Sequence, residues 1–414
     1  MKVFSVLTIC CTIVAASPLG NWAALSGNDA LELRLIKLGP QEYSIISELE
    51  KVSLRRRGKK FMDVTNQISI EEAYTLGLVS RPQTSLWKQM LFSASGAKQI
   101  EMMNKPVKEY KYPKKLSYKS LVQDLNDQID KDSIYENLSQ FTSFYTRYYK
   151  SKSGAESSDW LYEKVNHLTK PISKDYEVNI TRVHHKGWDQ TSLIVSIPGN
   201  VTDKVVVGAH QDSIHLLLPQ LRAPGADDDG SGTVTTLEAL RLVVQAISTG
   251  QFSPYNTLEF HYYSAEEGGL LGSADVFARY YDSGAVVLSM LQQDMTGYST
   301  GSKNQGIEEH LGLITDYTNV GLNGFLKLVI DTYNDIPYHE TECGYACSDH
   351  ASALENGYPS AFIIESEFKF SNQFIHSSMD TIEKIDFDHV AEHVKLTVGY
   401  AIELSGTNIL NKSN

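Results

Sequence analysis

The chain has 414 residues with a formal net charge of −13, and 42% of its residues are hydrophobic. This length and composition are typical of a globular enzyme with a large core and exclude a disordered or fibrous protein. The negative charge argues against a nucleic-acid partner, because phosphate binding requires a basic surface.

The first sixteen residues have the features of a secretory signal. Lys2 gives a positive start, residues 3–14 form a short apolar run, and small residues at 14–16 provide a cleavage site before Ser17. The run is too short to span a membrane, and no later segment has about 20 uninterrupted apolar residues. We therefore expect a secreted, extracellular protein that has no membrane partner. A buried N-terminal strand is the alternative.

Residues 17–109 differ in charge from the rest of the chain. They contain 13 Lys and Arg against 10 Asp and Glu, whereas residues 110–414 contain 23 against 40. These opposite signs, together with the basic cluster at 55–60, predict a propeptide that covers the active site until proteolysis removes it. A permanent small N-terminal domain is the alternative.

From about residue 110 the chain alternates between short β-rich runs and segments of helical periodicity. This alternation predicts an α/β domain over residues 110–414, with a mixed, mostly parallel central sheet and helices on both faces. The expected strands are 193–197, 205–208, 257–263, 286–291, 311–315 and 361–364. The expected helices are 121–129, 135–149, 158–168, 233–247, 270–281 and 322–333.

Export restricts the cysteine chemistry, because Cys10 and Cys11 leave with the signal. Cys343 and Cys347 remain, and in an oxidising compartment we expect them to form a tight disulfide loop; free thiols are the alternative. A zinc ribbon would need two more thiols.

Four Asn-x-Ser/Thr sequons make the protein a candidate glycoprotein, with acceptors at Asn137, Asn179, Asn200 and Asn411.

The most informative stretch is Ala-Pro-Gly-Ala-Asp-Asp-Asp-Gly-Ser-Gly at residues 223–232. Adjacent carboxylates repel each other, and a helix start requires only one of them as a cap. A bound cation would explain all three. An acidic N-terminal cap is the alternative interpretation.

Other candidate ligands follow the expected strands, where open α/β sheets bind their ligands. His210 and Asp212 follow 205–208, Glu266 and Glu267 follow 257–263, Asp294 follows 286–291, and His376 lies beyond 361–364. Each of these residues also has a non-functional interpretation, such as capping a turn or lying on the surface. Their shared placement at strand ends nevertheless favours a ligand-binding site. Other histidines, among them His310 and His339, are expected to bind no metal.

A mixed set of histidines and carboxylates suits zinc, and one bridging carboxylate suits two zinc ions about 3.5–4 Å apart. Zinc lowers the pKa of bound water and polarises a carbonyl. Of the adjacent pair, one glutamate would bind metal while the other acts as a general base and later passes the proton to the leaving amine. The pattern predicts amide hydrolysis without a covalent intermediate.

These motifs together resemble the secreted leucyl aminopeptidases of bacteria and fungi that use two zinc ions. The matching elements are Gly-Ala-His-Gln-Asp-Ser at 208–213, the acidic stretch, Ala-Glu-Glu-Gly at 265–268, Asp-Met-Thr at 294–296, the cysteine loop at 343–349 and Ile-His at 375–376. Their order and spacing match over residues 110–405, and the segment from 138 to 160 is similar to the fungal branch. The leader is less similar, and there the likeness depends mainly on residues 61–65.

The resemblance implies a role for each matching residue. Asp227 would bridge the two zinc ions, His210 and Asp294 would complete one zinc site, and Glu267 and His376 would complete the other. Glu266 would be the general base, and Asp212 would orient His210. A cis peptide bond would join Asp227 to Asp228, and Asp229 would only start the following helix. Tyr345, beside the disulfide, is a candidate hydrogen-bond donor to the tetrahedral intermediate. Candidates for an apolar pocket wall are Met295, Phe368, Phe370 and Ile375, with ordinary core packing as the alternative for each.

The leading hypothesis is a secreted, monomeric dizinc aminopeptidase that removes apolar, leucine-like residues from peptides and is made with a propeptide. A glutaminyl cyclase on the same fold is the nearest alternative, because it shares much of the ligand set but works with one zinc. A non-catalytic binding module is the alternative from another class.

Overall fold

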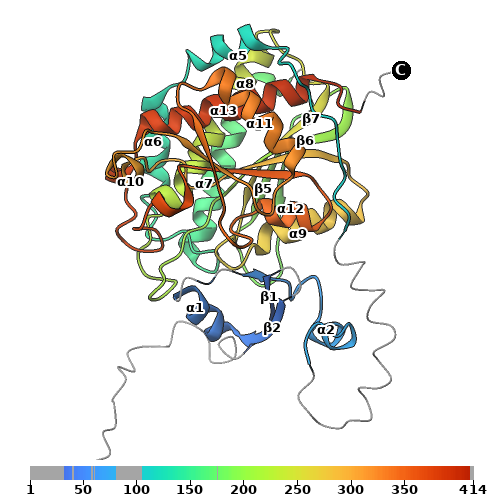
Figure 1. The fold of residues 1–414 in the computed structure, drawn as a ribbon, viewed down its shortest axis with the longest axis vertical. Helices are drawn as coiled ribbons and strands as arrows, with labels where there is room; N and C mark the ends of the chain where they lie inside the picture. Colours follow the sequence, from blue (N-terminus) through green and yellow to red (C-terminus); the bar gives the residue numbers. More distant parts are fainter. Residues whose placement is uncertain are drawn as a thin grey trace, which may run out of the picture.

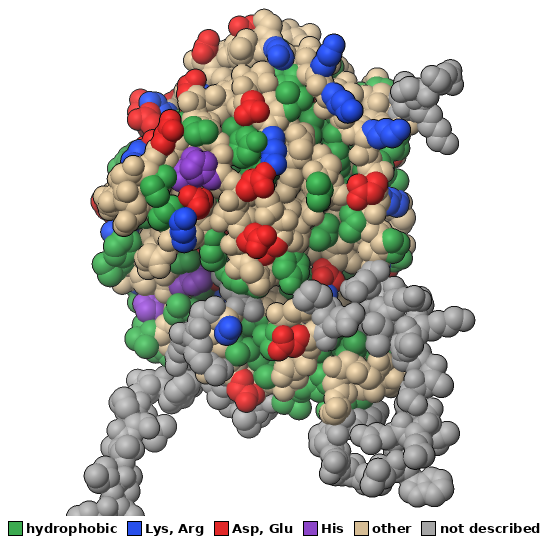
Figure 2. Space-filling view, viewed as in Figure 1, with side chains coloured by type: hydrophobic (Ala, Val, Ile, Leu, Met, Phe, Trp, Pro, Cys, Tyr) green, Lys and Arg blue, Asp and Glu red, His purple; other side chains and the backbone are tan. Residues whose placement is uncertain are grey.

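The computed structural model describes residues 32–39, 42–56, 59, 61–80, 105–174 and 176–410. The expected signal at residues 1–16 and the sequon at Asn411 lie outside the described residues. Within those residues, none of the helices combines the length and apolar character needed to cross a membrane. On the face drawn in Figure 2, acidic and basic side chains lie interspersed over the described surface.

An eight-stranded sheet forms the centre of the large domain, residues 105–410, with strand order β10-β9-β11-β8-β6-β7-β5-β4 (Figure 1). Its central pairs β11/β8, β8/β6 and β6/β7 are parallel, as is the edge pair β10/β9, and the other three pairs are antiparallel. The expected mixed, mostly parallel sheet is confirmed. The strands are β4 (Asn179–Val183), β5 (Ser192–Ile197), β6 (Val201–His210), β7 (Asn256–Tyr263), β8 (Val287–Gln293), β9 (Leu311–Ile314), β10 (Tyr338–Thr341) and β11 (Ser360–Ile364).

Helices cover both faces of this sheet because the central strands are apolar on both sides. In β6, Val205 and Val207 belong to the larger core, whereas Val206 points into a second, smaller core. The larger core lies under α5 (Lys119–Asn126), α6 (Lys131–Phe141), α7 (Lys152–Thr169), α8 (Gly232–Ser248), α11 (Val320–Tyr333) and α13 (Phe387–Gly406). The other face carries α9 (Leu271–Asp282) and α12 (His350–Glu355), and α10 (Thr300–Lys303) is a short peripheral turn.

The prediction of a helix at 135–149 is wrong for the second half of this range. α6 ends at Phe141, and Thr146 then forms an isolated parallel bridge with Ala223. The aromatic residues of this segment have helical spacing, but after Phe141 the backbone turns and bends, and it meets the loop before the acidic stretch at Thr146. The other expected helices and strands agree with the structure within a few residues at most ends, whereas β4, β10 and α13 were not expected.

A separate unit precedes the large domain, which we call the leader unit (described residues 32–80). β1 (Leu33–Gly39), β2 (Glu42–Ser47) and β3 (Met62–Asp63) form an antiparallel sheet in the order β2-β1-β3, with α1 (Glu48–Arg56) and α2 (Ile70–Thr75) beside it (Figure 1). Its core, including Met62 and Val64, packs on Leu270 and Ala351 of the large domain. The leader unit therefore lies directly on the domain that carries the site, and the cleavage position near residue 109 stays a prediction.

Charged side chains hold this small unit together. Asp63 is fully buried and accepts from Lys51 at 2.7 Å and from Arg34 at 2.8 Å. Burial alone would raise the pKa of Asp63, but these two cations outweigh it and lower the pKa to about 2. The Asp63 backbone N–H also donates to the carbonyl of Gly269 at 2.9 Å, which joins the leader unit to the turn after Glu266 and Glu267.

Candidate active site

The sheet brings the expected ligands together at one edge, where the parallel strands β6, β7, β8 and β11 end. Each strand delivers its ligand from its carboxyl end or from the loop beyond, which is why residues far apart in sequence converge. Two groups of ligand atoms result. The first contains His210, Asp229 and Asp294; the second contains Asp228, Glu267 and His376.

Asp228 lies between the two histidines and faces each of them with a different oxygen. Its Oδ1 is 3.0 Å from Nε2 of His210, and its Oδ2 is 2.8 Å from Nε2 of His376. Asp294 Oδ1 lies 3.5 Å from the first ring, and Glu267 Oε1 lies 3.1 Å from the second. This is the geometry of one bridging carboxylate with two ligands on either side.

The expectation that Asp227 bridges is therefore wrong by one residue. The carboxylate of Asp227 points away from the histidines and accepts from Gly297 N at 3.0 Å and Asn372 Nδ2 at 3.0 Å. The cis peptide bond joins Asp228 to Asp229, not Asp227 to Asp228. Asp380 sets this register, because its two oxygens accept from the backbone N–H groups of Asp227 and Asp228 at 3.0 and 3.1 Å.

Asp229 does more than start a helix, contrary to expectation. Its carboxylate caps α8 by accepting from Gly232 N at 2.8 Å, and it also accepts from the backbone N–H groups of His210 and Met295, each at 3.1 Å. Asp229 thereby joins the segments that carry the first group of ligands.

The buried atoms at this edge fit zinc. Asp228 Oδ2, Glu267 Oε1, Asp294 Oδ1 and His376 Nε2 are buried and make no hydrogen bond within the described structure. Leaving buried polar atoms unsatisfied is costly. Imidazole nitrogens and carboxylate oxygens are the ligands that zinc prefers, and four such atoms facing one place are what a zinc pair would satisfy.

The charges of the cluster also favour binding of a cation. Burial alone would lower the pKa of His376, but the carboxylates of Glu267 and Asp228 outweigh it and raise that pKa to about 10. The pKa of His210 is likewise raised, because Asp294 and its other carboxylate neighbours outweigh its burial. The site therefore attracts positive charge.

Asp212 supports this cluster as expected. Its Oδ1 lies 3.4 Å from Nδ1 of His210, so that Nε2 faces the ligand group. Its two oxygens also accept from the backbone N–H groups of Glu266 and Glu267 at 3.0 and 3.1 Å. One buried carboxylate thus lies against the ring of His210 and holds the turn that carries both glutamates, of which Glu266 is itself buried.

The expected pocket residues mostly gather in one apolar cluster. Met295, Phe368 and Ile375 pack with Tyr345 around the Cys343–Cys347 disulfide. Phe370 does not belong to this cluster and lies instead beneath the ammonium of Lys369.

Among the expected glycan acceptors, Asn179 and Asn200 are exposed, but Asn137 is buried on α6 and cannot take a glycan in this fold.

Sequence reasoning missed several buried groups around the ligands. Glu365 follows β11 directly, so the strand-end rule could have found it. Its carboxyl is hydrogen-bonded to Asp227, and burial together with Asp227 raises the pKa of Glu365 well above its usual range. Asp380 and Asn372 carry no comparable sequence signal. Arg147 was included only within a segment of family likeness.

The leader unit reaches into the site through Arg55. Its Nη1 lies 2.6 Å from Oε2 of Glu267, and its Nη2 lies 3.4 Å from the carbonyl of Glu266. Arg55 thus pairs with the oxygen of Glu267 opposite the one that faces His376. The leader unit covers the site with a cation placed on a ligand carboxylate.

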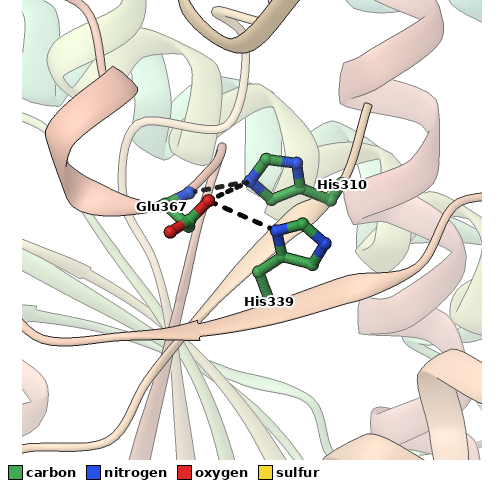
Figure 3. A group of neighbouring side chains, drawn as sticks. All are labelled: His310, His339 and Glu367. Atoms are coloured by element: carbon green, nitrogen blue, oxygen red, sulfur yellow. Dashed lines mark hydrogen bonds and ion pairs between the residues drawn. The ribbon is translucent and has the colours of Figure 1, made fainter. Parts of the chain in front are cut away.

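A third group of metal-binding side chains, His310, His339 and Glu367, lies outside this site (Figure 3). Nδ1 of His310 donates to the Glu308 carbonyl at 2.7 Å, and its Nε2 accepts from the Glu367 N–H at 3.1 Å. The two rings are stacked 3.9 Å apart and 19° from parallel. Nδ1 of His339 also lies 3.3 Å from the Glu367 carboxylate, so these three side chains already interact with one another.

The chain is similar to known peptidases. The model of peptidase family M28 matches residues 192–401. A probable aminopeptidase of Saccharomyces cerevisiae is 47% identical over 379 residues, 90% of this chain and 92% of the relative. Leucine aminopeptidase 1 of Paracoccidioides brasiliensis is 45% identical over 372 residues, 90% of this chain and 89% of the relative.

Solved structures give the same result. The LapA aminopeptidase of Legionella pneumophila superimposes with a TM-score of 0.75 at 26% identity, over 91% of this chain and 99% of LapA. A glutaminyl cyclase of Porphyromonas gingivalis reaches a TM-score of 0.52 at 18% identity, over 66% of this chain and 97% of that protein, a likeness of fold alone.

Proposed function

The chain belongs to peptidase family M28 and is an aminopeptidase, and we propose that it is a secreted dizinc enzyme that removes apolar, leucine-like residues from the amino ends of peptides. The observation that carries the proposal is Asp228, which offers one oxygen to each histidine and so divides five ligands into two sites. His210 and Asp294 would hold one zinc ion, and Glu267 and His376 the other.

Two zinc ions held there would polarise the scissile carbonyl and activate the attacking water. Glu266 takes a proton from that water and delivers it to the departing amine. Asp212 holds the backbone of Glu266 in place, and Tyr345 donates to the negative charge that develops on the carbonyl oxygen. The apolar cluster around the disulfide receives the first side chain of the peptide.

We further propose that the chain is made as a zymogen that is exported by the signal at residues 1–16. The contact between Arg55 and Glu267 supports this proposal, because a peptide amine would have to compete with a guanidinium already placed on the carboxylate. The exposed sequons at Asn179 and Asn200 are compatible with export. The mature form acts as a monomer on peptides, without nucleic acid or a membrane.

The test is hydrolysis of a panel of aminoacyl anilides by the full chain, before and after limited proteolysis of the leader. We expect leucine-like substrates to be preferred, activity to disappear with a chelator and return with zinc, and two zinc ions per chain. Fewer than one zinc ion per active chain, or cleavage only of peptides with a blocked amino end, would refute the proposal.

A peptide with N-terminal glutamine distinguishes an aminopeptidase from a glutaminyl cyclase, the main alternative. A cyclase would form pyroglutamate from this peptide, whereas an aminopeptidase would release free glutamine. Glu266→Ala distinguishes an enzyme from a non-catalytic binding module. Biological activity that survives this change would not depend on catalysis.

A further inference from the structure

Arg147 is fully buried, and the ion pairs of the described residues do not include it. Its guanidinium instead donates to three backbone carbonyls: Nε to Gln211 at 2.8 Å, Nη2 to Gly225 at 2.8 Å, and Nη1 to Pro224. It also lies 4.2 Å from the ring centre of Phe141. Burying a charged side chain against backbone alone is costly, so this arrangement needs an explanation.

The three carbonyls belong to the two loops that carry ligands. Gln211 directly follows His210, whereas Pro224 and Gly225 lead into the turn that presents Asp228. One side chain therefore holds both loops at a fixed separation. Its backbone is held as well, because Arg147 N–H donates to Ser213 Oγ at 3.0 Å.

The turn that receives the guanidinium is tightly packed. Gly225 has a left-handed φ of 53°, and a Cβ at that position would lie 2.5 Å from the carbonyl oxygen of Asp228, 2.7 Å from Cβ of Ser213 and 2.8 Å from Nη2 of Arg147. The carbonyl of Gly225 also accepts from Gly230 N–H at 3.0 Å, which closes the loop around the three aspartates. Arginine suits the place because its planar fork donates in several fixed directions, whereas a lysine acts as a point charge.

The charge on Arg147 has a second effect. Burial lowers its pKa to about 10, although Asp380 and Asp229 act against this change, and the group stays charged at neutral pH. It therefore contributes a permanent positive charge beside the buried carboxylates of the site.

Building on the proposed function, we propose that Arg147 is a positioning residue for the zinc pair, which sets the distance between His210 and Asp228 by holding the carbonyls of their two loops. It touches neither substrate nor metal. Its loss loosens the ligand arrangement and lowers zinc affinity.

The test compares Arg147→Lys, which keeps the charge but loses the fork, with Arg182→Lys. Arg182 is a matched control because it also stacks on an aromatic ring, Tyr162 at 4.0 Å, and pairs with Asp159 on the surface of the large domain. Zinc affinity is measured by competition with a coloured chelator, and ligand geometry by the visible spectrum of the cobalt-substituted full chain. We expect Arg147→Lys to weaken zinc binding about 10–100-fold, as loss of an outer support typically does, and to alter the spectrum. Arg182→Lys should change neither.

Ser213→Ala keeps the experiment decisive if Arg147→Lys fails to fold, because it removes only the acceptor for the Arg147 N–H and the donor to Ala223. We expect a smaller loss of zinc affinity in the same direction. The inference is overturned if folded Arg147→Lys binds zinc with unchanged affinity and spectrum, or if Ser213→Ala does so when the lysine variant does not fold. Failure of wild-type chain to bind zinc would instead refute the proposed function.

Discussion

Replacing Arg55 with alanine should activate the uncleaved chain. The side chain of Arg55 is 11% exposed and that of Glu267 only 1%, so their 2.6 Å contact is a largely buried ion pair. Because Oε1 of Glu267 faces His376 while Oε2 faces Arg55, the contact leaves the metal-facing oxygen in place and blocks the approach to it. On the proposed zymogen mechanism, the leader unit would inhibit without disturbing the other contacts of Glu267.

The size of the effect follows from the cost of breaking such a pair. Removing one partner of a buried charge pair costs about 3–5 kcal/mol when the other charge stays buried and unpaired. Glu267 keeps His376 as a neighbour and gains access to water once the leader moves, so we expect a smaller loss of about 2 kcal/mol. That free energy corresponds to an open form about 30 times more populated.

The assay is kcat/KM of the uncleaved full chain on a leucyl anilide. Lys37→Ala is the matched control, because Lys37 forms another ion pair between leader unit and large domain, to Glu355 at 2.6 Å, outside the ligand cluster. We expect activation of about 30-fold for Arg55→Ala and a smaller gain for Arg55→Lys. Lys37→Ala should also give a smaller gain, because Glu355 is 23% exposed and its freed charge regains water.

Two results would refute this reasoning. If Arg55→Ala left the uncleaved chain as inactive as wild type while proteolysis activated both, the ion pair would not control access. If Lys37→Ala activated the chain as much as Arg55→Ala, general loosening of the leader unit would explain the effect.

The remaining predictions concern the aspartates. Asp228→Asn should lose zinc binding and activity far more severely than Asp227→Asn. The expected loss for Asp227→Asn is about 10–100-fold, because Asp227 only supports the ligands through Gly297 and Asn372. Zinc content and kcat/KM measure both effects, and the reverse order would contradict the assignment. Asp63 should make the leader unit sensitive to acid. Its folded pKa of about 2 lies below the ordinary 3.8, so the stabilisation of about 2 kcal/mol is complete above about pH 4 and is lost as the pH falls toward 2. Protease digestion of the leader unit over this range should show the loss in wild type and a flat profile in Asp63→Asn; parallel profiles would contradict it.

The strand-end rule predicted most of the site from sequence. His210, Glu267, Asp294 and His376 each follow a strand, and carboxyl ends of neighbouring parallel strands must meet. The rule could not choose among three consecutive aspartates. Their different partners depend on the local backbone, where Asp228 and Asp229 are joined by a cis peptide bond and Asp380 holds the N–H groups of Asp227 and Asp228 from a distant loop.

The segment around Arg147 shows a second limit. Its aromatic residues have helical spacing, and local pattern favours a helix there. In the structure the helix ends at Phe141 and turns follow, and Arg147 contacts the carbonyls of Gln211 and Gly225, which are tertiary partners. Local periodicity contains no information about a contact of that kind.

The apolar contact between the two units has a consequence for the solution behaviour of the protein. Leu270, Ala351 and Ala346 form part of a joint core with the leader unit, and Phe61 and Met62 line a cavity with Tyr345. If the leader is cleaved and released as proposed, this apolar surface would face water. The cleaved form would then be more prone to self-association at high concentration than the intact chain, which would be the better form to store.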